Sequence, residues 1–291
     1  MNASSQFHRI ALIAKPDDNA QLRPTLLAIE RFLRERSLDI HYDQRAASTL
    51  QQGNGEALPT LARNTDLAIV IGGDGTLLSS AREMVDAGIP LLGINLGRLG
   101  FLVDISPEDM LGTLGAVLDG HYEQDSRFLL RCEIGDKEPQ LALNDVVLHK
   151  WNIARMIEFE TWVNGKFIDT QRSDGMIIST PTGSTAYALS GGGPLLAPSL
   201  DAIAMVPICP HTLSNRPIVV HGNSQILISV CGKTDPDHVR VTCDGQASLR
   251  IDPGEKVRVH KHPVPLRLLH PTGHDHYQIL RAKLGWGGLR S

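Results

Sequence analysis

The sequence predicts an α/β N-terminal domain with a largely parallel, Rossmann-like sheet, followed by a β-rich, antiparallel, sandwich-like C-terminal domain. Over residues 1–120, apolar strand-like runs alternate with segments of helical periodicity, which is typical of a parallel sheet. Over residues 121–270 this alternation stops, and short strand-like runs follow one another with turns between them. Residues 271–291 form a tail that contains one short amphipathic helical pattern.

The elements of the first domain follow from hydrophobic spacing. A run of apolar and β-branched residues predicts a buried strand, and apolar residues every three or four positions predict a helix. The predicted strands are 7–14, 38–42, 66–71 and 89–95, and the predicted helices are 20–36, 59–62 and 76–87. A further helix is expected to begin at 106–109, with Ser106 as N-cap and Pro107 at the first position.

The segment Gly72-Gly73-Asp74-Gly75-Thr76 joins the third predicted strand to its helix. Glycines let another molecule approach the main chain closely, and the N-terminus of the helix, expected at Thr76, favours an anion. Asp74 is unusual there, because a carboxylate repels phosphate unless it serves a metal or takes a proton. The alternative is a tight turn in which Asp74 only caps the helix.

A second glycine loop, residues 97–100, follows the fourth predicted strand. Ligands of parallel sheets bind beyond the carboxyl ends of the strands. We therefore expect the two glycine loops to face one cleft.

The second domain is predicted from turn signals. Asn164-Gly165 separates the β-rich runs 156–163 and 166–170, which is a strong signal for a hairpin. Further strands are expected at 218–220, 225–231, 238–243 and 256–260, one helix at 184–190, and a tail helix at 275–284.

Two polar clusters interrupt apolar segments of this domain. Asn144-Asp145 lies between apolar runs, so the pair is either a solvated strand end or a pair that binds ribose hydroxyls. Five hydroxyl residues, a glycine and a tyrosine gather at 179–187. One hydroxyl suffices to cap a helix, so the excess favours a nucleoside with a phosphate nearby.

Composition excludes several classes of protein. The chain has 291 residues, of which 42% are hydrophobic and 21% charged, with a net charge of −4 from 28 basic and 32 acidic residues. This charge argues against a nucleic-acid partner, which needs a basic face. No apolar run approaches the roughly 18 residues of a membrane span, and residues 1–8 lack the apolar core of a signal peptide.

The four cysteines lie far apart and form no C-x-x-C pair. They are Cys132, Cys209, Cys231 and Cys243. This usage favours a reducing cytoplasm over a disulfide framework, so we expect a cytoplasmic protein without structural disulfides. We expect all four to be small buried apolar residues.

Five motifs together resemble the bacterial NAD kinase family. They are GGDGT at 72–76, GRLGF at 97–101, ND at 144–145, RSDG at 172–175 and TPTGSTAY at 180–187. GGDGT alone is also similar to the loops of diacylglycerol and sphingosine kinases and, more loosely, of phosphofructokinases. The 180–187 segment separates the chain from the lipid kinases. The resemblance extends from the first strand to Trp286.

The resemblance implies an enzyme that transfers the γ-phosphoryl group of ATP to the adenosine ribose 2′-hydroxyl of NAD with a divalent metal, Mg²⁺. It also implies a C-terminal tail that packs on the first domain and a homodimer or homotetramer. Asp74 is expected to activate the hydroxyl, and Gly72, Gly73, Gly75 and Thr76 to form the phosphate loop. No protein ligand is assigned to the metal, which we expect ATP phosphates to hold.

The positions that the resemblance assigns to NAD binding lie in both domains. They are Asp74, Gly75, Asn144, Asp145, Arg155, Arg172, Asp174, Thr185, Ala186, Tyr187, Ala188, Leu189, Ser190 and Gln246, with Phe101 as a weaker addition. Asp145 stands where many members of the family have glutamate. The shorter acid shifts the expected ribose hydrogen bond but offers the same chemistry.

Several histidines lie close together near the C-terminus, at positions 260, 262, 270, 274 and 276. Imidazole is a common zinc ligand, but no cysteine or carboxylate completes a known spacing. We expect solvated loop histidines rather than a zinc site.

Two alternatives to an NAD kinase remain. One is a lipid or sugar kinase that shares the GGDGT loop, although neither an acyl-binding surface nor a sugar-phosphate site is visible. The other is a binding protein that senses NAD or NADP without turnover. Retention of Asp74 argues against the sensor, because a carboxylate beside phosphates is a liability without chemistry.

Overall fold

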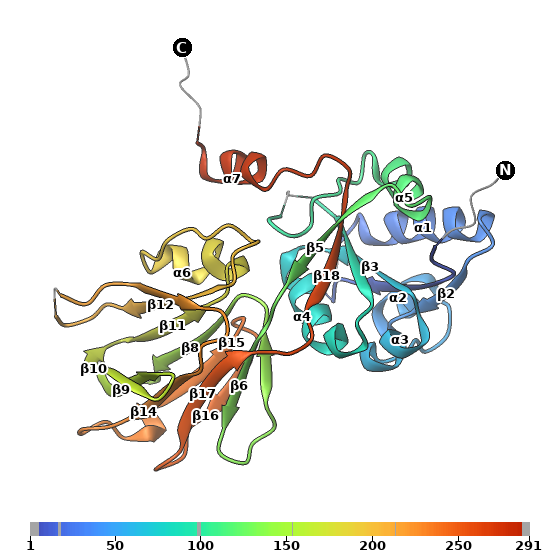
Figure 1. Cartoon of the computed structure of the whole chain (residues 1–291). Coiled ribbons are helices and arrows are strands. Elements are labelled where there is room, and N and C mark those ends of the chain that lie inside the picture. The colour runs from blue at the N-terminus through green and yellow to red at the C-terminus, as the bar shows by residue number, and fades with distance from the viewer. Residues whose placement is uncertain (1–5, 17–18, 98–99, 153, 213, 287–291) are drawn as a thin grey trace. The chain divides into compact units, whose positions relative to one another are not determined.

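The computed structural model describes residues 6–16, 19–97, 100–152, 154–212 and 214–286. It consists of two compact units, one formed by residues 1–126 with 266–291 and the other by residues 127–265 (Figure 1). Each unit has its own hydrophobic core. Arg98 and Leu99, which belong to the GRLGF motif, lie outside the described residues.

A sheet with the strand order β2-β1-β3-β4-β18-β5 forms the centre of the first unit. Its pairs β1–β2, β1–β3, β3–β4 and β4–β18 are parallel, which confirms the predicted α/β class. The C-terminal strand β18 returns to this sheet (Figure 1). The strands are β1 (Arg9–Ala14), β2 (Asp39–Tyr42), β3 (Leu67–Gly72), β4 (Pro90–Asn95), β5 (Tyr122–Arg127) and β18 (Leu266–Pro271).

The helices of this unit bury the apolar positions that their spacing predicted. In α1, Leu26, Ile29 and Leu33 are fully buried in the core, one helical turn apart. The helices are α1 (Leu22–Glu35), α2 (Gln44–Leu50), α3 (Leu58–Asn64), α4 (Asp74–Met84), α5 (Met110–Leu118) and α7 (His276–Leu284). Helix α2 was not predicted. It is short, and the side chain of Asp43 caps it.

Two predicted helix starts were wrong. Helix α4 begins at Asp74 rather than Thr76, with Gly73 in the N-cap position, so Asp74 does not cap it. Helix α5 begins at Met110, with Asp109 at its N-cap position, so Ser106 does not cap it. A stretch of 3-10 helix, Val85–Ala87, continues α4 at its C-terminal end.

The second unit contains two antiparallel six-stranded sheets, ordered β10-β9-β14-β17-β6-β7 and β13-β12-β11-β8-β15-β16. Asn164 and Gly165 both have positive φ between β9 and β10, which confirms the predicted hairpin. The strands are β6 (Leu130–Ile134), β7 (Gln140–Ala142), β8 (Asp145–Lys150), β9 (Ile157–Val163), β10 (Lys166–Ser173), β11 (Gly175–Ser179), β12 (Ala202–Ile208), β13 (Ile218–His221), β14 (Ile226–Val230), β15 (Val239–Cys243), β16 (Ala247–Arg250) and β17 (Lys256–Lys261).

Strand β8 is buried on both of its faces. Val146 and Leu148 belong to the core that both sheets share, whereas Val147 packs in a second cluster with Ala188 and Leu196. Because side chains alternate along a strand, Asp145 and His149 lie on the same face as Val147. That face carries the cavity described below.

The predicted helix 184–190 is broken. A 3-10 helix at Thr182–Thr185 is followed by the four-residue helix α6 (Tyr187–Ser190), with an irregular backbone at Ala186 between them. A further 3-10 turn spans Pro236–His238.

Two expectations about buried and exposed residues also changed. None of the four cysteines forms a disulfide, but Cys209 is exposed and Cys231 is half-buried, so the expectation of burial was wrong for these two. His262 and His270 are buried, so the prediction of solvated loop histidines was wrong for both of these residues.

Within the described ranges, no helix is both long and apolar enough to cross a membrane.

Candidate functional site

The carboxylate of Asp74 is held by the backbone of one short segment in the first unit. The N–H of Phe101 donates to Oδ2 at 2.8 Å, and those of Leu102 and Val103 donate to Oδ1 at 3.1 and 3.2 Å. A carboxylate has about four acceptor positions, so roughly one remains for another donor. Asp74 is therefore fixed in orientation and can still accept one more hydrogen bond.

Gly100 permits this arrangement. A Cβ atom at position 100 would overlap Oδ1 of Asp74, whereas one at Gly97 would meet nothing within 4 Å. Gly100 thus lets the backbone of 101–103 approach the carboxylate, and this explains one glycine of the GRLGF motif. Phe101 contributes its backbone to this contact, and Lys283 lies 5.6 Å from the centre of its ring.

The GGDG loop ends β3 and opens α4, as a phosphate loop requires. The N–H of Thr76 donates to the carbonyl of Gly73 at 3.0 Å, as does that of Leu77 at 3.2 Å. Thr76 therefore closes the first turn of the helix with its own N–H. The role of Gly72, Gly73, Gly75 and Thr76 as a phosphate loop stays a prediction.

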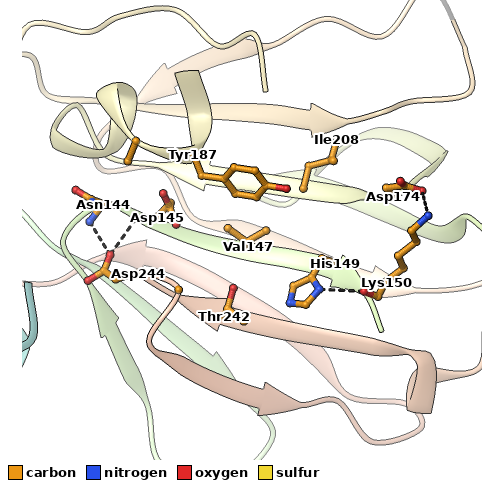
Figure 2. Close-up of a pocket in the computed structure, with 12 residues that line it drawn as sticks. Asn144, Asp145, Val147, His149, Lys150, Asp174, Tyr187, Ile208, Thr242 and Asp244 are labelled. Atoms are coloured by element: carbon orange, nitrogen blue, oxygen red, sulfur yellow. Dashed lines mark hydrogen bonds and ion pairs between the residues drawn. The ribbon is translucent and has the colours of Figure 1, made fainter. Parts of the chain in front are cut away.

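The second unit contains a cavity of about 510 Å³ on the α6 side of β8, β11 and β15 (Figure 2). Asn144, Asp145 and Asp244 are grouped at one end, and Lys150 with Asp174 at the other. Lys150 Nζ lies 2.8 Å from a carboxylate oxygen of Asp174. The residues that line the cavity are Asn144, Asp145, Val147, His149, Lys150, Asp174, Ala186, Tyr187, Ile208, Thr242, Asp244 and Gly245.

Asp244 holds the segment that opens this cavity. Its carboxylate accepts hydrogen bonds from the backbone N–H groups of Leu143, Asn144 and Asp145 at 3.0, 2.7 and 3.2 Å. These bonds fix the backbone at the start of β8, where Asn144 and Asp145 line the cavity. Sequence reasoning missed Asp244, because its partners lie about 100 residues earlier and leave no local signal.

Asp145 lies in an apolar and negatively charged environment. Burial and the charge of Asp244 raise the pKa of Asp145 to about 7. The solvated alternative for this residue was therefore wrong, since only 4% of it is exposed. Near neutral pH, Asp145 can either donate or accept a hydrogen bond, which suits a sugar hydroxyl.

This pKa predicts a pH-dependent stability. As pH rises from about 4 to 7, Asp145 ionises readily in the unfolded chain but resists ionisation in the folded one, so the folded state loses stability. Asp145→Asn removes this loss. We expect the stability of the variant relative to the wild type to increase by on the order of 2 kcal/mol from pH 5 to 7.5. Urea unfolding at both pH values measures the free energy of unfolding of each protein. An equal change in this free energy between pH 5 and 7.5 for the variant and the wild type would contradict the prediction.

Two hydroxyl residues of 179–187, Thr180 and Ser184, form hydrogen bonds that build the turn. Thr180 Oγ1 donates to the carbonyl of Leu143 at 2.6 Å and accepts from the N–H of Gly183 at 3.1 Å. Ser184 Oγ donates to the carbonyl of Pro181 at 2.6 Å. The turn thus uses the hydroxyls of Thr180 and Ser184, while the expected contact of Thr185 with NAD stays a prediction. Ala186 and Tyr187, which follow this turn, line the cavity.

Ser184 offers a test of this structural role. It is fully buried, and its Oγ also accepts the N–H of Leu196 at 3.0 Å. Ser184→Ala leaves that N–H and the carbonyl of Pro181 without this partner, so we expect a loss of roughly 1–3 kcal/mol of unfolding free energy. Thermal and urea unfolding measure it. An unchanged midpoint would contradict the role.

The structure brings together some of the predicted NAD-binding residues and not others. Asn144, Asp145, Asp174, Ala186 and Tyr187 line one cavity. The remaining predicted residues of this unit do not line it: Arg155, Arg172 and Gln246 are exposed, and Thr185, Ala188, Leu189 and Ser190 lie around it in the turn and α6. Asp74 and Gly75 belong to the first unit, and their role toward NAD stays a prediction.

Comparison with known proteins agrees with these features. Residues 10–122 match the ATP-NAD kinase N-terminal domain, and residues 143–270 match the ATP-NAD kinase C-terminal domain. An NAD kinase of Nitrosococcus oceani is 48% identical over 288 residues, with 97% of each chain covered. One from Chromohalobacter salexigens is 50% identical over 268 residues, covering 90% of this chain and 91% of the relative.

The chain belongs to the ATP-NAD kinase family. The predicted family is thereby confirmed, and the lipid-kinase and sugar-kinase alternatives are set aside.

Two solved structures share the fold of this family member. An NAD kinase of Archaeoglobus fulgidus, solved in complex with ATP, superposes with a TM-score of 0.74 at 26% identity and covers 95% of this chain and 98% of its own. A yeast NADH kinase, solved with NADH, has a TM-score of 0.87 at 24% identity and covers 98% of this chain and 93% of its own.

Proposed function

We propose that this ATP-NAD kinase family member transfers the γ-phosphoryl group of ATP to the adenosine ribose 2′-hydroxyl of NAD, with Asp74 as the proton acceptor. The observation that carries the proposal is the fixed carboxylate of Asp74, which accepts three backbone N–H groups and keeps roughly one acceptor position free. A carboxylate within reach of the hydroxyl can accept its proton as the new bond to phosphorus forms.

The cavity of the second unit suits the nucleoside part of NAD. Tyr187, which is 47% exposed, offers a ring face to a base, and Asn144 and Asp145 offer donors and acceptors to ribose hydroxyls. A cavity of about 510 Å³ has the size of a small-molecule site. We infer that Arg155, Arg172 and Gln246 act near the ligand only if it extends beyond this cavity.

ATP carries the charge that the enzyme must neutralise. Phosphoryl transfer needs positioning and charge neutralisation more than covalent help. The N-terminus of α4, which begins at Asp74, favours phosphate oxygens through the positive end of the helix dipole. The Asp74 carboxylate already accepts three hydrogen bonds, so we do not assign the loop as a set of oxygen ligands for Mg²⁺. When bound, Mg²⁺ on the ATP phosphates supplies charge neutralisation.

We also propose that the protein is cytoplasmic and forms a homodimer or homotetramer. The four free cysteines support a reducing compartment. Strand β10 is the edge of its sheet and exposes Phe167 and Ile168, which is compatible with association between copies.

Label transfer from [γ-³²P]ATP tests the proposed reaction. We expect label in NADP when NAD is the acceptor and Mg²⁺ is present, and none with diacylglycerol or a sugar phosphate. Chelation of the metal should abolish the transfer. A protein that binds NAD in a thermal-shift assay but transfers no label would be a sensor, and this would contradict the proposal.

A further inference from the structure

Asp104, His270 and His274 form a compact polar cluster in the first unit. His270 Nδ1 lies 3.0 Å and His274 Nδ1 lies 2.7 Å from the same oxygen, Oδ2, of Asp104. The side chains of Asp104, His270 and His274 are only 10%, 2% and 11% exposed. The three residues come from the segment after β4, from β18 and from the turn after β18. A buried cluster drawn from separate segments fixes them relative to one another.

The geometry of the cluster favours direct hydrogen bonds over a shared metal ion. The imidazole rings stack at 3.8 Å between centres with an angle of 19° between their planes. Ligands about 2.0 Å from a tetrahedral metal lie roughly 3.3 Å apart, farther than the two nitrogen–oxygen distances here. Because an ionised carboxylate can only accept hydrogen bonds, we assign both Nδ1 atoms as donors to Asp104.

The cluster adjoins the segment that holds Asp74. Asp104 directly follows Phe101–Val103, whose three N–H groups donate to the Asp74 carboxylate. On its other side the segment is tied to β4, because the carbonyl of Ile105 accepts the N–H of Asn95 at 2.8 Å. Strand β18, which carries His270, pairs with β4 as well. The C-terminal strand thus supports the backbone of the Asp74 contact.

We propose that Asp104, His270 and His274 are positioning residues that hold the 101–103 backbone, and through it the carboxylate of Asp74, in the reactive orientation. The inference rests on the proposed role of Asp74 as proton acceptor. None of the three residues needs to touch the substrate. Burial alone would raise the pKa of Asp104, but hydrogen bonds from both histidines outweigh it and lower the pKa to about 2, so the carboxylate is charged throughout the working range.

Amide hydrogen exchange tests the positioning without reference to activity. In the free enzyme, Asp104→Asn should accelerate exchange in a peptide that covers residues 100–105 by tenfold or more, because the segment loses its anchor. Asp119→Asn is the matched control, since that exposed carboxylate pairs with Arg36 in the same unit. Unchanged exchange in Asp104→Asn would overturn the proposal.

Conservative replacement separates hydrogen bonding from packing. His274→Asn places an amide nitrogen as many bonds from Cα as Nδ1 and should retain most of the wild-type kcat. His274→Phe keeps a ring but removes the donor and should behave like Asp104→Asn. Equal activity of the two His274 variants would overturn the proposal. So would stoichiometric zinc in protein purified without an affinity tag, if His274→Phe removed it.

A double-mutant cycle connects the cluster to Asp74. Asp104→Asn should lower kcat about tenfold or more, with the KM for NAD within about threefold of the wild type. In an Asp74→Asn background the same change should cost less than about twofold, because the group it positions is already gone. Equal losses in both backgrounds would overturn the proposal. Full activity of the Asp74→Asn variant alone would instead contradict the proposed role of Asp74 as proton acceptor. The hydrogen-exchange result for Asp104→Asn would not be affected by that outcome.

Discussion

Replacing Asp74 with asparagine should lower kcat for NADP formation by about 10²–10⁴-fold while leaving the affinity for NAD nearly unchanged. Asparagine has the same shape but cannot take the proton of the attacking hydroxyl. Its carbonyl oxygen can still accept the N–H groups of Leu102 and Val103, so the segment is expected to stay in place. The loss should therefore appear in turnover and not in binding.

Steady-state kinetics and NAD titration on the same preparations check this result. Asp119→Asn serves as a control for the loss of one carboxylate in this unit, because its partner Arg36 lies at the surface. Full activity in a folded Asp74→Asn variant would remove Asp74 from the mechanism.

Gly100→Ala should also lower kcat, by on the order of 10²-fold, although residue 100 has no side chain to lose. The added Cβ would overlap Oδ1 of Asp74, so either the carboxylate or the 101–103 backbone must move. A displacement of about 1 Å suffices for a loss of this size when a reacting group must lie within hydrogen-bond reach.

Gly97→Ala is the matched control for Gly100→Ala. It lies in the same loop, and its new Cβ would meet nothing within 4 Å. We expect near-wild-type turnover from Gly97→Ala, with similar unfolding midpoints for both variants. Equal kcat values for the two alanine variants would show that the close contact at Gly100 does not position Asp74.

The parallel sheet and the β9–β10 hairpin were predictable because their signals are local. Buried strands such as β3 read as continuous apolar runs, and Asn164-Gly165 requires the positive φ values that both residues adopt. The start of α4 was misplaced because the Asp74 side chain bonds residues 101–103 instead of capping the helix. No local sequence pattern indicates that the partners of Asp74 lie 27 to 29 residues further along the chain.

The difference between local and distant contacts also explains which residues of the candidate site could be predicted. Asn144 and Asp145 were noticeable as polar residues between apolar runs, and the family resemblance assigned them, Asp174 and Tyr187 to NAD; all four line one cavity. The structural roles of Thr180 and Ser184 could not be predicted, because their partners, such as the N–H of Leu196, are fixed by tertiary structure. Asp244 and Asp104 depend on contacts between distant segments and leave no local signal, and the sequence alone shows His270 and His274 only as neighbouring histidines.

The most direct test of the account compares NAD with an analogue that lacks only the adenosine ribose 2′-hydroxyl. Wild-type enzyme, ATP and Mg²⁺ are incubated with each, and binding and phosphate transfer are measured in parallel. We predict that NAD is converted to NADP and that the analogue binds but receives no phosphate. Phosphorylation of the analogue would contradict the proposed acceptor and, with it, the role assigned to Asp74.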